Sequence, residues 1–296
     1  MNVGVFGLGS MGYGIAASLL RAGHSVWGFD TVSAQVDKFV SEGGFNETIA
    51  AAVPCLDVVV IVVLNAAQTE SVLFGSHGIA GYMKSSATII SCATVAPAFA
   101  RSMASQCKAS ELLYLDAPIS GGAIKAAAGK LSVMASGESA AFKGARRVLD
   151  DIAETVFELG DEAGAGSAMK AVNQLLAGVH IAAMAEAMTF GIAQGIKADA
   201  IVDVISKCAG TSWMFENRAP HVVTGDYSPR SSVDIWPKDL GIVLDIAHNS
   251  KFKAPLTSAA LEQFVAASEA GLGGEDDAAV AKIYAQNANI SLPGVQ

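Results

Sequence analysis

A single lysine stands in a long stretch of the chain that carries no other charged side chain. The stretch GAGSAMKAVNQLLAGVHIAAMA covers residues 164–185, and Lys170 is its one charge. Taking a charge out of water without a partner is costly. An amine in a cleft can act as a general acid or base, because its neutral form accepts a proton and its ammonium form returns one. Free lysine titrates near ~10.4, so this task requires burial or a nearby positive charge to lower the pKa.

Two amide side chains follow this lysine at helical spacing. Asn173 lies three residues further on and Gln174 four, which places both on the same face of a helix as Lys170. Asn173 can hold the amine or bond a substrate hydroxyl, so that the two side chains could act together in catalysis. Gln174 is predicted to bind the substrate, with a purely structural role as the alternative. The alternative for Lys170 is a buried methylene stem with its ammonium group in water.

A glycine-rich turn near the N-terminus predicts a dinucleotide-binding site. It follows an apolar strand, opens a helix and has the pattern GxGxxG, formed by Gly7, Leu8, Gly9, Ser10, Met11 and Gly12. The first glycine permits the tight turn, the second lets the backbone approach a pyrophosphate, and the third permits close packing of helix and strand. Free N–H groups at the helix start would face the phosphates. The alternative is a tight turn without a ligand.

An acidic residue at the end of the second strand indicates which dinucleotide would bind. Asp30 lies where a carboxylate can accept bonds from the adenosine ribose hydroxyls. Its charge would repel a 2′-phosphate, so we expect NAD rather than NADP as the cofactor. The alternative is that Asp30 only caps its strand.

A second glycine turn could bind an anionic substrate. Ser120, Gly121 and Gly122 follow a strand end and a proline. The two glycines leave backbone N–H groups accessible, and together with the Ser120 hydroxyl these can surround a carboxylate. The alternative is an ordinary turn. Lys125 follows closely and could either favour polar acids or face solvent.

The first half of the chain alternates between strands and helices, and these elements must position the candidate residues. The run at 58–64 is rich in Val and Ile, as is typical of a strand covered on both faces. Ser33 is expected to cap a helix at 34–40, after a first helix at 11–21. The alternation predicts a mainly parallel sheet wrapped by helices. The predicted strands are 3–6, 25–30, 58–64, 88–91, 112–116, 131–135 and 156–159.

After residue 163 the pattern is almost wholly helical. We predict an α/β Rossmann-type N-terminal domain at 1–163, which binds NAD. An all-α C-terminal domain at 164–296 would serve substrate binding and oligomerisation. The helix with Lys170 would then lie at the junction of the domains, where pockets are common. The predicted helices are 168–194, 198–207, 237–250 and 255–270.

Composition excludes several classes of protein. The chain has 296 residues, of which 52% are hydrophobic, and a net charge of -9. This acidic balance argues against nucleic acid and anionic membranes as partners, while a small anionic substrate stays compatible with it. The scattered cysteines indicate reduced, mostly buried thiols in a cytoplasmic protein. The spacing of histidines and cysteines fits no metal site, so we expect no metal. Polar residues interrupt the long apolar helix, so we expect no membrane span.

Four segments in order resemble the β-hydroxyacid dehydrogenase family, which includes 3-hydroxyisobutyrate dehydrogenase and tartronate semialdehyde reductase. They are GLGSMGYGIAASLL at 7–20, DAPISGGAIKAAAGKL at 116–131, GAGSAMKAVNQ at 164–174 and KDLGIVLD at 238–245. The resemblance implies NAD-dependent oxidation of a small hydroxy acid, with Lys170 as the catalytic group near the substrate hydroxyl. It also implies that Thr94 touches the nicotinamide ribose, with a helix cap as the alternative, and that Lys238 reaches the cofactor.

Within the family, the segments at 170–180 and 211–240 resemble those of enzymes acting on four-carbon sugar acids. This implies L-threonate as the substrate and its oxo acid as the product. The substrates of 3-hydroxyisobutyrate dehydrogenase and tartronate semialdehyde reductase remain alternatives, as does an inactive nucleotide-binding scaffold. Retention of Lys170 argues against an imine reductase, which shares the architecture. The apolar surface of the helix at 168–194 predicts a homodimer or homotetramer.

Overall fold

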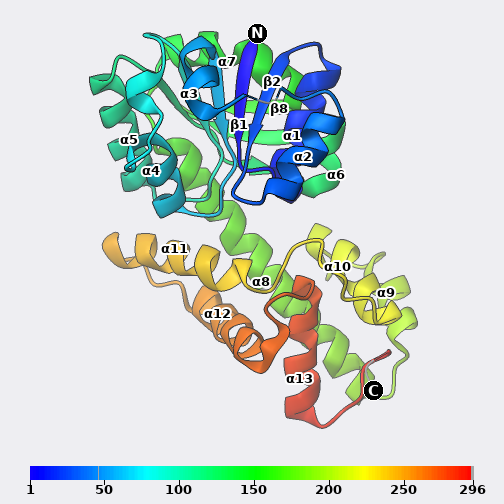
Figure 1. Cartoon of the computed structure of the whole chain (residues 1–296). Coiled ribbons are helices and arrows are strands. Elements are labelled where there is room, and N and C mark those ends of the chain that lie inside the picture. Colours follow the sequence, from blue (N-terminus) through cyan, green and yellow to red (C-terminus); the bar gives the residue numbers. More distant parts are fainter. Residues whose placement is uncertain (46, 295–296) are drawn as a thin grey trace. The chain divides into compact units, whose positions relative to one another are not determined.

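The computed structural model describes residues 1–45 and 47–294. The chain divides into two compact units, Met1–Lys170 and Ala171–Gln296. The first unit combines strands and helices, and the second consists of helices (Figure 1). This arrangement confirms the predicted fold class. The domain limits expected from the sequence, 1–163 and 164–296, remain a prediction.

A five-stranded parallel sheet forms the centre of the first unit. Its strands run in the order β2-β1-β3-β4-β5, so the order reverses between β1 and β3. Ligands of such sheets bind beyond the carboxyl ends of the strands at this switch point. The strands are β1 Asn2–Phe6, β2 Ser25–Phe29, β3 Val58–Ile61, β4 Thr88–Ser91 and β5 Leu113–Asp116.

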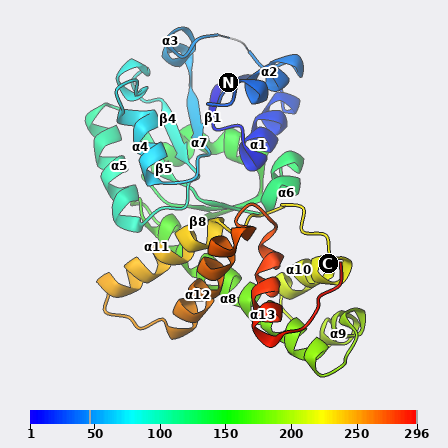
Figure 2. The same cartoon turned by 60° about the horizontal axis from the view of Figure 1, so that its bottom comes forward.

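Helices cover both faces of this sheet. The first unit contains α1 Ser10–Arg21, α2 Ser33–Ser41, α3 Ile49–Ala52, α4 Ala66–Phe74, α5 Pro97–Ala109, α6 Gly122–Ala128 and α7 Ser139–Ile152. Val58 and Val60 of β3 pack with residues of α1 and α7, whereas Val59 and Ile61 pack with residues of α4 and α5. Figure 2 shows α4 and α5 on the opposite side of the strands from α1. Burial on both faces explains why β3 is continuously apolar.

A second, three-stranded sheet differs from the prediction of one mainly parallel sheet. Its strands are β6 Ile119–Ser120, β7 Leu131–Ala135 and β8 Ala153–Glu158. β6 pairs antiparallel with β7, and β7 pairs parallel with β8. A bridge between Asp116 at the end of β5 and Ser136 after β7 connects the two sheets. The sequence did not indicate β6, because a strand of two residues has no periodicity.

Several predicted element limits differ from the structure; the helices predicted at 168–194 and 255–270, for example, span Ala165–Ala193 and Pro255–Ala267. β3 ends at Ile61 rather than at residue 64, because the side chain of Asn65 caps α4 by accepting the N–H of Gln68 at 2.9 Å. β8 begins at Ala153, three residues earlier than predicted. Ser33 is the first residue of α2 and not its cap, which is Val32.

The second unit packs its helices around one apolar core. α8 Ala165–Ala193 begins in the first unit and continues into the second. The core includes Met184, Phe215 and Phe264. The sequence pattern did not indicate α10 or α13, and α10 contains Pro220, which weakens a helical pattern. The other helices are α9 Ala198–Ile205, α10 Trp213–Thr224, α11 Ile235–Asn249, α12 Pro255–Ala267 and α13 Ala281–Ala288.

Helix α8 is long and apolar. It is the one helix in the described part of the chain whose length and composition alone would allow it to cross a membrane. Buried core helices of soluble proteins pass the same test, so this observation is weak evidence for a span. Its buried residues Ile181, Met184 and Met188 belong to the core of the second unit.

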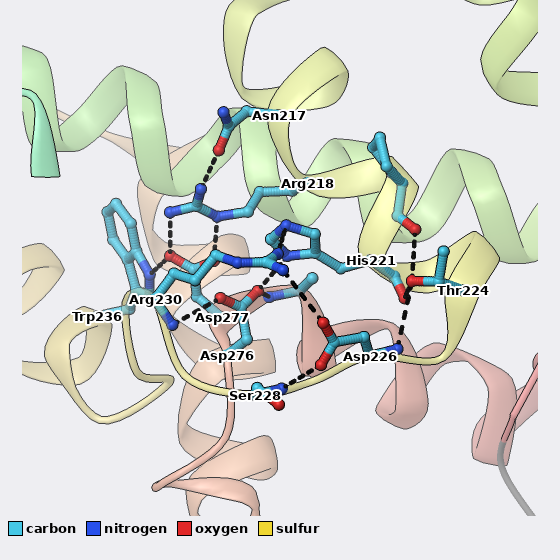
Figure 3. A network of polar contacts seen from close by, with 12 residues as sticks. Asn217, Arg218, His221, Thr224, Asp226, Ser228, Arg230, Trp236, Asp276 and Asp277 are labelled. Atoms are coloured by element: carbon cyan, nitrogen blue, oxygen red, sulfur yellow. Dashed lines mark hydrogen bonds and ion pairs between the residues drawn. The ribbon is translucent and has the colours of Figure 1, made fainter. Parts of the chain in front are cut away.

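A buried polar network in the second unit connects α10, the start of α11 and the segment of Asp276 and Asp277 (Figure 3). Asp277 is 0% exposed and accepts bonds from Arg218 Nε at 2.5 Å and from Trp236 Nε1 at 3.0 Å. The neighbouring Asp276 contacts His221 Nδ1 at 2.7 Å and accepts the Arg230 backbone N–H at 3.2 Å. Burial raises the pKa of Asp277, and its bond and charge interaction with Arg218 partly oppose this. The network therefore holds α10 to the start of α11.

Candidate active site

The first glycine turn has the backbone that its pattern predicts. Gly7 has φ +95°, and a Cβ there would lie 2.3 Å from the carbonyl oxygen of Val62. A Cβ on Gly12 would lie 1.9 Å from the Gly7 oxygen. Both positions therefore exclude any side chain. A Cβ on Gly9, by contrast, would meet no atom of the described residues within 4 Å, so the space beside this residue is open to a ligand.

Asp30 holds this turn in place. Its Oδ2 accepts the N–H of Leu8 at 2.6 Å, and its Oδ1 accepts the N–H of Val32 at 2.8 Å. The carboxylate thus ties the end of β2 to the turn after β1. α1 starts at Ser10, and no side chain of the described residues caps it. The N–H groups of Ser10 and Met11 are therefore available to a phosphate, which fits a bound dinucleotide.

The other predicted cofactor residue of this unit lies at the same edge of the sheet. Thr94 follows the end of β4 by three residues and is half buried. It does not cap the next helix, because the N-cap of α5 is Ala96. All strands of this sheet are parallel, so Asp30, the glycine turn, Thr94 and the end of β5 follow one another along one carboxyl edge. An extended dinucleotide can lie along such an edge.

The second glycine turn leads from β6 into α6. Ser120 ends β6, and Gly121 and Gly122 have φ +136° and +72°. A Cβ on Gly122 would meet no described atom within 4 Å, so its backbone is approachable. The Lys125 side chain lies beside Gly121 and is about half exposed, and its Nζ is 3.8 Å from Glu154 Oε2.

Lys170 lies next to this second turn. The residue is 8% exposed, and its Nζ donates a hydrogen bond of 3.0 Å to the carbonyl oxygen of Ile119. Ile119 directly precedes Ser120. The first unit therefore brings the predicted amine and the predicted carboxylate-binding turn together. This bond joins residues 51 positions apart in the chain.

The start of α8 is bound to the end of β5. Asp116 Oδ2 accepts the backbone N–H groups of Gly164 and Ser167 at 2.9 and 2.8 Å. Its Oδ1 accepts the Ser167 hydroxyl at 2.6 Å. Ser136 Oγ accepts the N–H of Gly166 at 2.9 Å and donates to Asp116 Oδ2 at 3.3 Å. Burial raises the pKa of Asp116, and these hydrogen bonds partly oppose it. Asp116 was not among the predicted site residues, although it opens the segment DAPISGG.

The predicted residues of the second unit form a chain of polar contacts. Asn173 Nδ2 donates to Gln174 Oε1 at 2.9 Å, and Gln174 Nε2 donates to Asp239 Oδ2 at 2.5 Å. Asp239 Oδ1 in turn lies 2.6 Å from Lys238 Nζ. Gln174 therefore links Asn173 to the KDL segment of α11. Sequence spacing does not reveal such a link, because Gln174 and Asp239 are 65 positions apart.

The cysteines differ in part from their prediction. All four are free thiols, but only Cys92 and Cys107 are buried, whereas Cys55 and Cys208 are exposed. Burial raises the pKa of both buried thiols to about 12. These two are therefore not thiolates at neutral pH. Within residues 1–45 and 47–294, no cluster of three or more His, Cys, Asp or Glu side chains could hold a metal ion.

Fold and site together define a class of protein. A phosphate-accessible glycine turn opens the first helix of a parallel sheet, and a carboxylate holds it at the adjacent strand. Such a turn binds a nicotinamide dinucleotide. A nearly buried amine lies beside a second glycine turn. These features are those of a nicotinamide-dependent oxidoreductase.

Comparison with known families agrees with this class. Residues 2–160 match the family model described as the NAD binding domain of 6-phosphogluconate dehydrogenase. Residues 164–284 match the model described as NAD-binding of NADP-dependent 3-hydroxyisobutyrate dehydrogenase. The chain belongs to the β-hydroxyacid dehydrogenase family and is an NAD-dependent hydroxyacid oxidoreductase. Its substrate is a small hydroxy acid. The alternative of an inactive scaffold is thereby not supported.

Individual relatives cover the whole chain. An L-threonate dehydrogenase of Cupriavidus necator is 50% identical, over 99% of this chain and 98% of its own length. An L-threonate dehydrogenase of Escherichia coli K12 is 47% identical, over 100% and 97%. A crystal structure of 3-hydroxyisobutyrate dehydrogenase from Salmonella typhimurium is 49% identical, with a TM-score of 0.90 over 95% of this chain and 99% of that one. An imine reductase from Streptomyces aurantiacus is 20% identical with a TM-score of 0.65, over 96% and 99% of the two chains, and shares the fold alone.

Proposed function

We propose that the protein oxidises L-threonate, a four-carbon sugar acid, to its oxo acid, with NAD as hydride acceptor and Lys170 as general acid and base. The choice of substrate draws on the relatives of Cupriavidus necator and Escherichia coli, which are L-threonate dehydrogenases. Two further proteins of this name, from Pectobacterium atrosepticum and Haemophilus influenzae, are each 46% identical.

One observation carries the proposed mechanism. The Lys170 amine lies 3.0 Å from the Ile119 carbonyl oxygen, directly before the turn of Ser120, Gly121 and Gly122. A hydroxy acid has a carboxylate close to its carbinol carbon. A turn that holds the carboxylate therefore presents the hydroxyl group to an amine fixed beside that turn.

The residues of the first unit would divide the reaction between them. Bound NAD would supply the acceptor for the hydride of the carbinol carbon. Neutral Lys170 Nζ takes the hydroxyl proton as the hydride leaves, and its ammonium form returns that proton in the reverse reaction. The N–H groups of Gly121 and Gly122, with the Ser120 hydroxyl, hold the substrate carboxylate.

Other residues would bind the cofactor and the substrate hydroxyl. The turn at 7–12 would hold the pyrophosphate, and Asp30 would accept bonds from the adenosine ribose. Thr94 would bind the nicotinamide ribose, and Lys238 would also bind the cofactor. Asn173 orients the amine or the hydroxyl group. Gln174 contacts the substrate or, as its two hydrogen bonds favour, holds Asn173.

Substitution of Lys170 tests the mechanism. Lys170→Ala should lower kcat by about three orders of magnitude, since general acid–base catalysis contributes about 10²–10⁴-fold. The Kd of NAD should stay unchanged. Lys108→Met serves as the control, because Lys108 is an exposed lysine of the same unit, paired with Glu138. A Lys170→Ala variant with a normal kcat would refute the proposed role.

A comparison of substrates tests the assignment to L-threonate. Initial rates with NAD should be highest for L-threonate among hydroxy acids of three to five carbons. The Salmonella typhimurium structure bears the name 3-hydroxyisobutyrate dehydrogenase, so this acid is the first competitor to measure. Tartronate semialdehyde with NADH is the second. If either compound gives a higher kcat/KM than L-threonate, the assignment to L-threonate is wrong.

The exposed face of α8 supports a homodimer or homotetramer. Val172, Leu176 and Phe190 of the second unit are exposed apolar side chains at helical spacing. An apolar stripe of this kind is typically covered by another subunit. Light scattering of the purified protein should give a mass of two or four chains, and a monomer would contradict the proposal. We also propose a cytoplasmic enzyme without a membrane span and without nucleic acid as partner.

A further inference from the structure

We propose that Asp116 is a positioning residue for Lys170 and that it acts by fixing the start of α8. This inference rests on the proposed catalytic role of Lys170. It assigns a task to a buried carboxylate that the proposed mechanism does not otherwise use.

The surroundings of Asp116 are those of a helix anchor. The residue is 1% exposed and ends β5. It accepts three hydrogen bonds from the segment that opens α8, namely two from backbone N–H groups and one from the Ser167 hydroxyl. A fourth bond comes from Ser136, which also accepts the N–H of Gly166. The N–H groups at the start of a helix need such acceptors, and here a distant strand supplies them.

The charge of Asp116 is balanced by the helix start. In the described part of the chain, no ion pair involves this carboxylate; the donors that it meets are N–H and O–H groups. A negative charge at a helix N-terminus is stabilised by the helix dipole. A shift of α8 would therefore leave a buried carboxylate without its donors, which is unfavourable. Asp116 and the start of α8 hold each other in place.

Two contacts between the same two segments orient the amine. Ser167 binds Asp116, and one helical turn later Lys170 binds the carbonyl oxygen of Ile119, three residues after Asp116. One contact alone would let α8 rotate, whereas the pair sets both its register and its rotation. The segment 116–122 thus carries the anchor, the acceptor of the amine and the proposed carboxylate turn.

Close packing at the helix start supports a fixed register. A Cβ on Gly166 would lie 2.4 Å from the Met134 oxygen and 2.7 Å from the backbone oxygen of Asp116. The backbone of α8 therefore approaches the ends of β5 and β7 more closely than any side chain would permit. A displacement of about 1 Å at a catalytic group can lower a rate by about a hundredfold, so this fixed register matters for catalysis.

A double-mutant cycle tests the inference. Asp116→Asn places an amide nitrogen against N–H donors, and Ser167→Ala removes the hydroxyl bond alone. Each substitution is made in the full-length protein and in the Lys170→Ala background. The measured quantities are kcat and KM for the hydroxy acid, the Kd of NAD and the melting temperature. Thr48→Ala is the control, because Thr48 caps α3 in the same unit.

The expected result separates positioning from general stability. Asp116→Asn should lower kcat by about a hundredfold, and Ser167→Ala by a smaller factor, while the Kd of NAD changes less than about threefold. In the Lys170→Ala background neither should lower the residual kcat further, because the amine on which they act is gone. Thr48→Ala should leave kcat unchanged. This pattern supports the inference even if the Asp116 variant melts at a lower temperature.

Three other patterns would overturn it. If Asp116→Asn and Ser167→Ala leave kcat normal although Lys170→Ala is inactive, this inference is wrong and the proposed function stands. Equal losses with and without Lys170, together with weaker NAD binding, would also show a merely structural residue. A normal kcat for Lys170→Ala refutes the proposed function itself, and the positioning role falls with it.

Discussion

The substitution Arg218→Ala should destabilise the second unit strongly. Arg218 binds Asp277 with Nε at 2.5 Å and Nη2 at 3.3 Å, and the Asp277 side chain is fully buried (Figure 3). Removing one partner of a buried ion pair costs about 3–5 kcal/mol, because the remaining charge is uncompensated. Trp236 still donates to Asp277, so we expect the lower end, about 3 kcal/mol.

A thermal melt measures this loss. In a domain of this size a change of 1 kcal/mol shifts the melting temperature by about 2–4 °C, so Arg218→Ala should lower it by about 6–12 °C. Arg146→Ala is the control, because Arg146 is also an ion-paired arginine, but its partners Asp150 and Glu158 lie at the surface. Surface pairs contribute about 0–1 kcal/mol. A loss for Arg218→Ala no larger than that of the control would refute the reasoning.

The stability lost on substituting Arg218→Ala should also depend on pH. Burial raises the pKa of folded Asp277, and Arg218 opposes this rise, so removing Arg218 raises the pKa further. A raised carboxyl pKa means that the folded state binds the proton more tightly than the unfolded state. The variant therefore loses stability as pH rises from the ordinary aspartate pKa, about 3.9, through the pKa of folded Asp277. The difference in the free energy of unfolding between the variant and the unsubstituted protein should be larger at pH 8 than at pH 5.

Three further substitutions test the site. Gly12→Ala should weaken NAD binding at least about tenfold in a fluorescence titration, because the new Cβ would overlap the Gly7 oxygen. Asp30→Ser should raise the ratio of kcat/KM for NADP to that for NAD, and an unchanged ratio would contradict its proposed role. Gln174→Leu leaves a buried oxygen of Asp239 without its donor. It should lower kcat/KM by about tenfold, and an unaltered value would show that the link is not needed.

The local features of the site were predictable from the sequence. The turn at Gly7–Gly12 needs glycines because two of its positions exclude a side chain, and such a requirement is visible in the residue types. The apolar run at 58–61 indicated a strand buried on both faces. Motifs in order indicated the family, which the comparisons confirm. The roles of Lys170, Asn173 and the other site residues remain predictions.

Elements without a strong local pattern were less predictable. The two-residue strand β6 has too few residues for a period, and α10 carries Pro220 within it. Ser33 has the residue type of a cap, but the helix begins at Ser33 itself. Cys55 and Cys208 are exposed although cysteines are usually buried. In each case the surrounding fold outweighs the local preference.

By itself the sequence determined the class of fold, the nucleotide turn and the family, because these depend on backbone requirements and periodicity within a few residues. Tertiary structure alone decided that Lys170 binds the Ile119 carbonyl, that Asp116 anchors α8 and that Gln174 binds Asp239. These contacts join residues 51 to 65 positions apart. Hydrogen bonds act over about 3 Å, so only the packed chain determines which distant groups come within their reach.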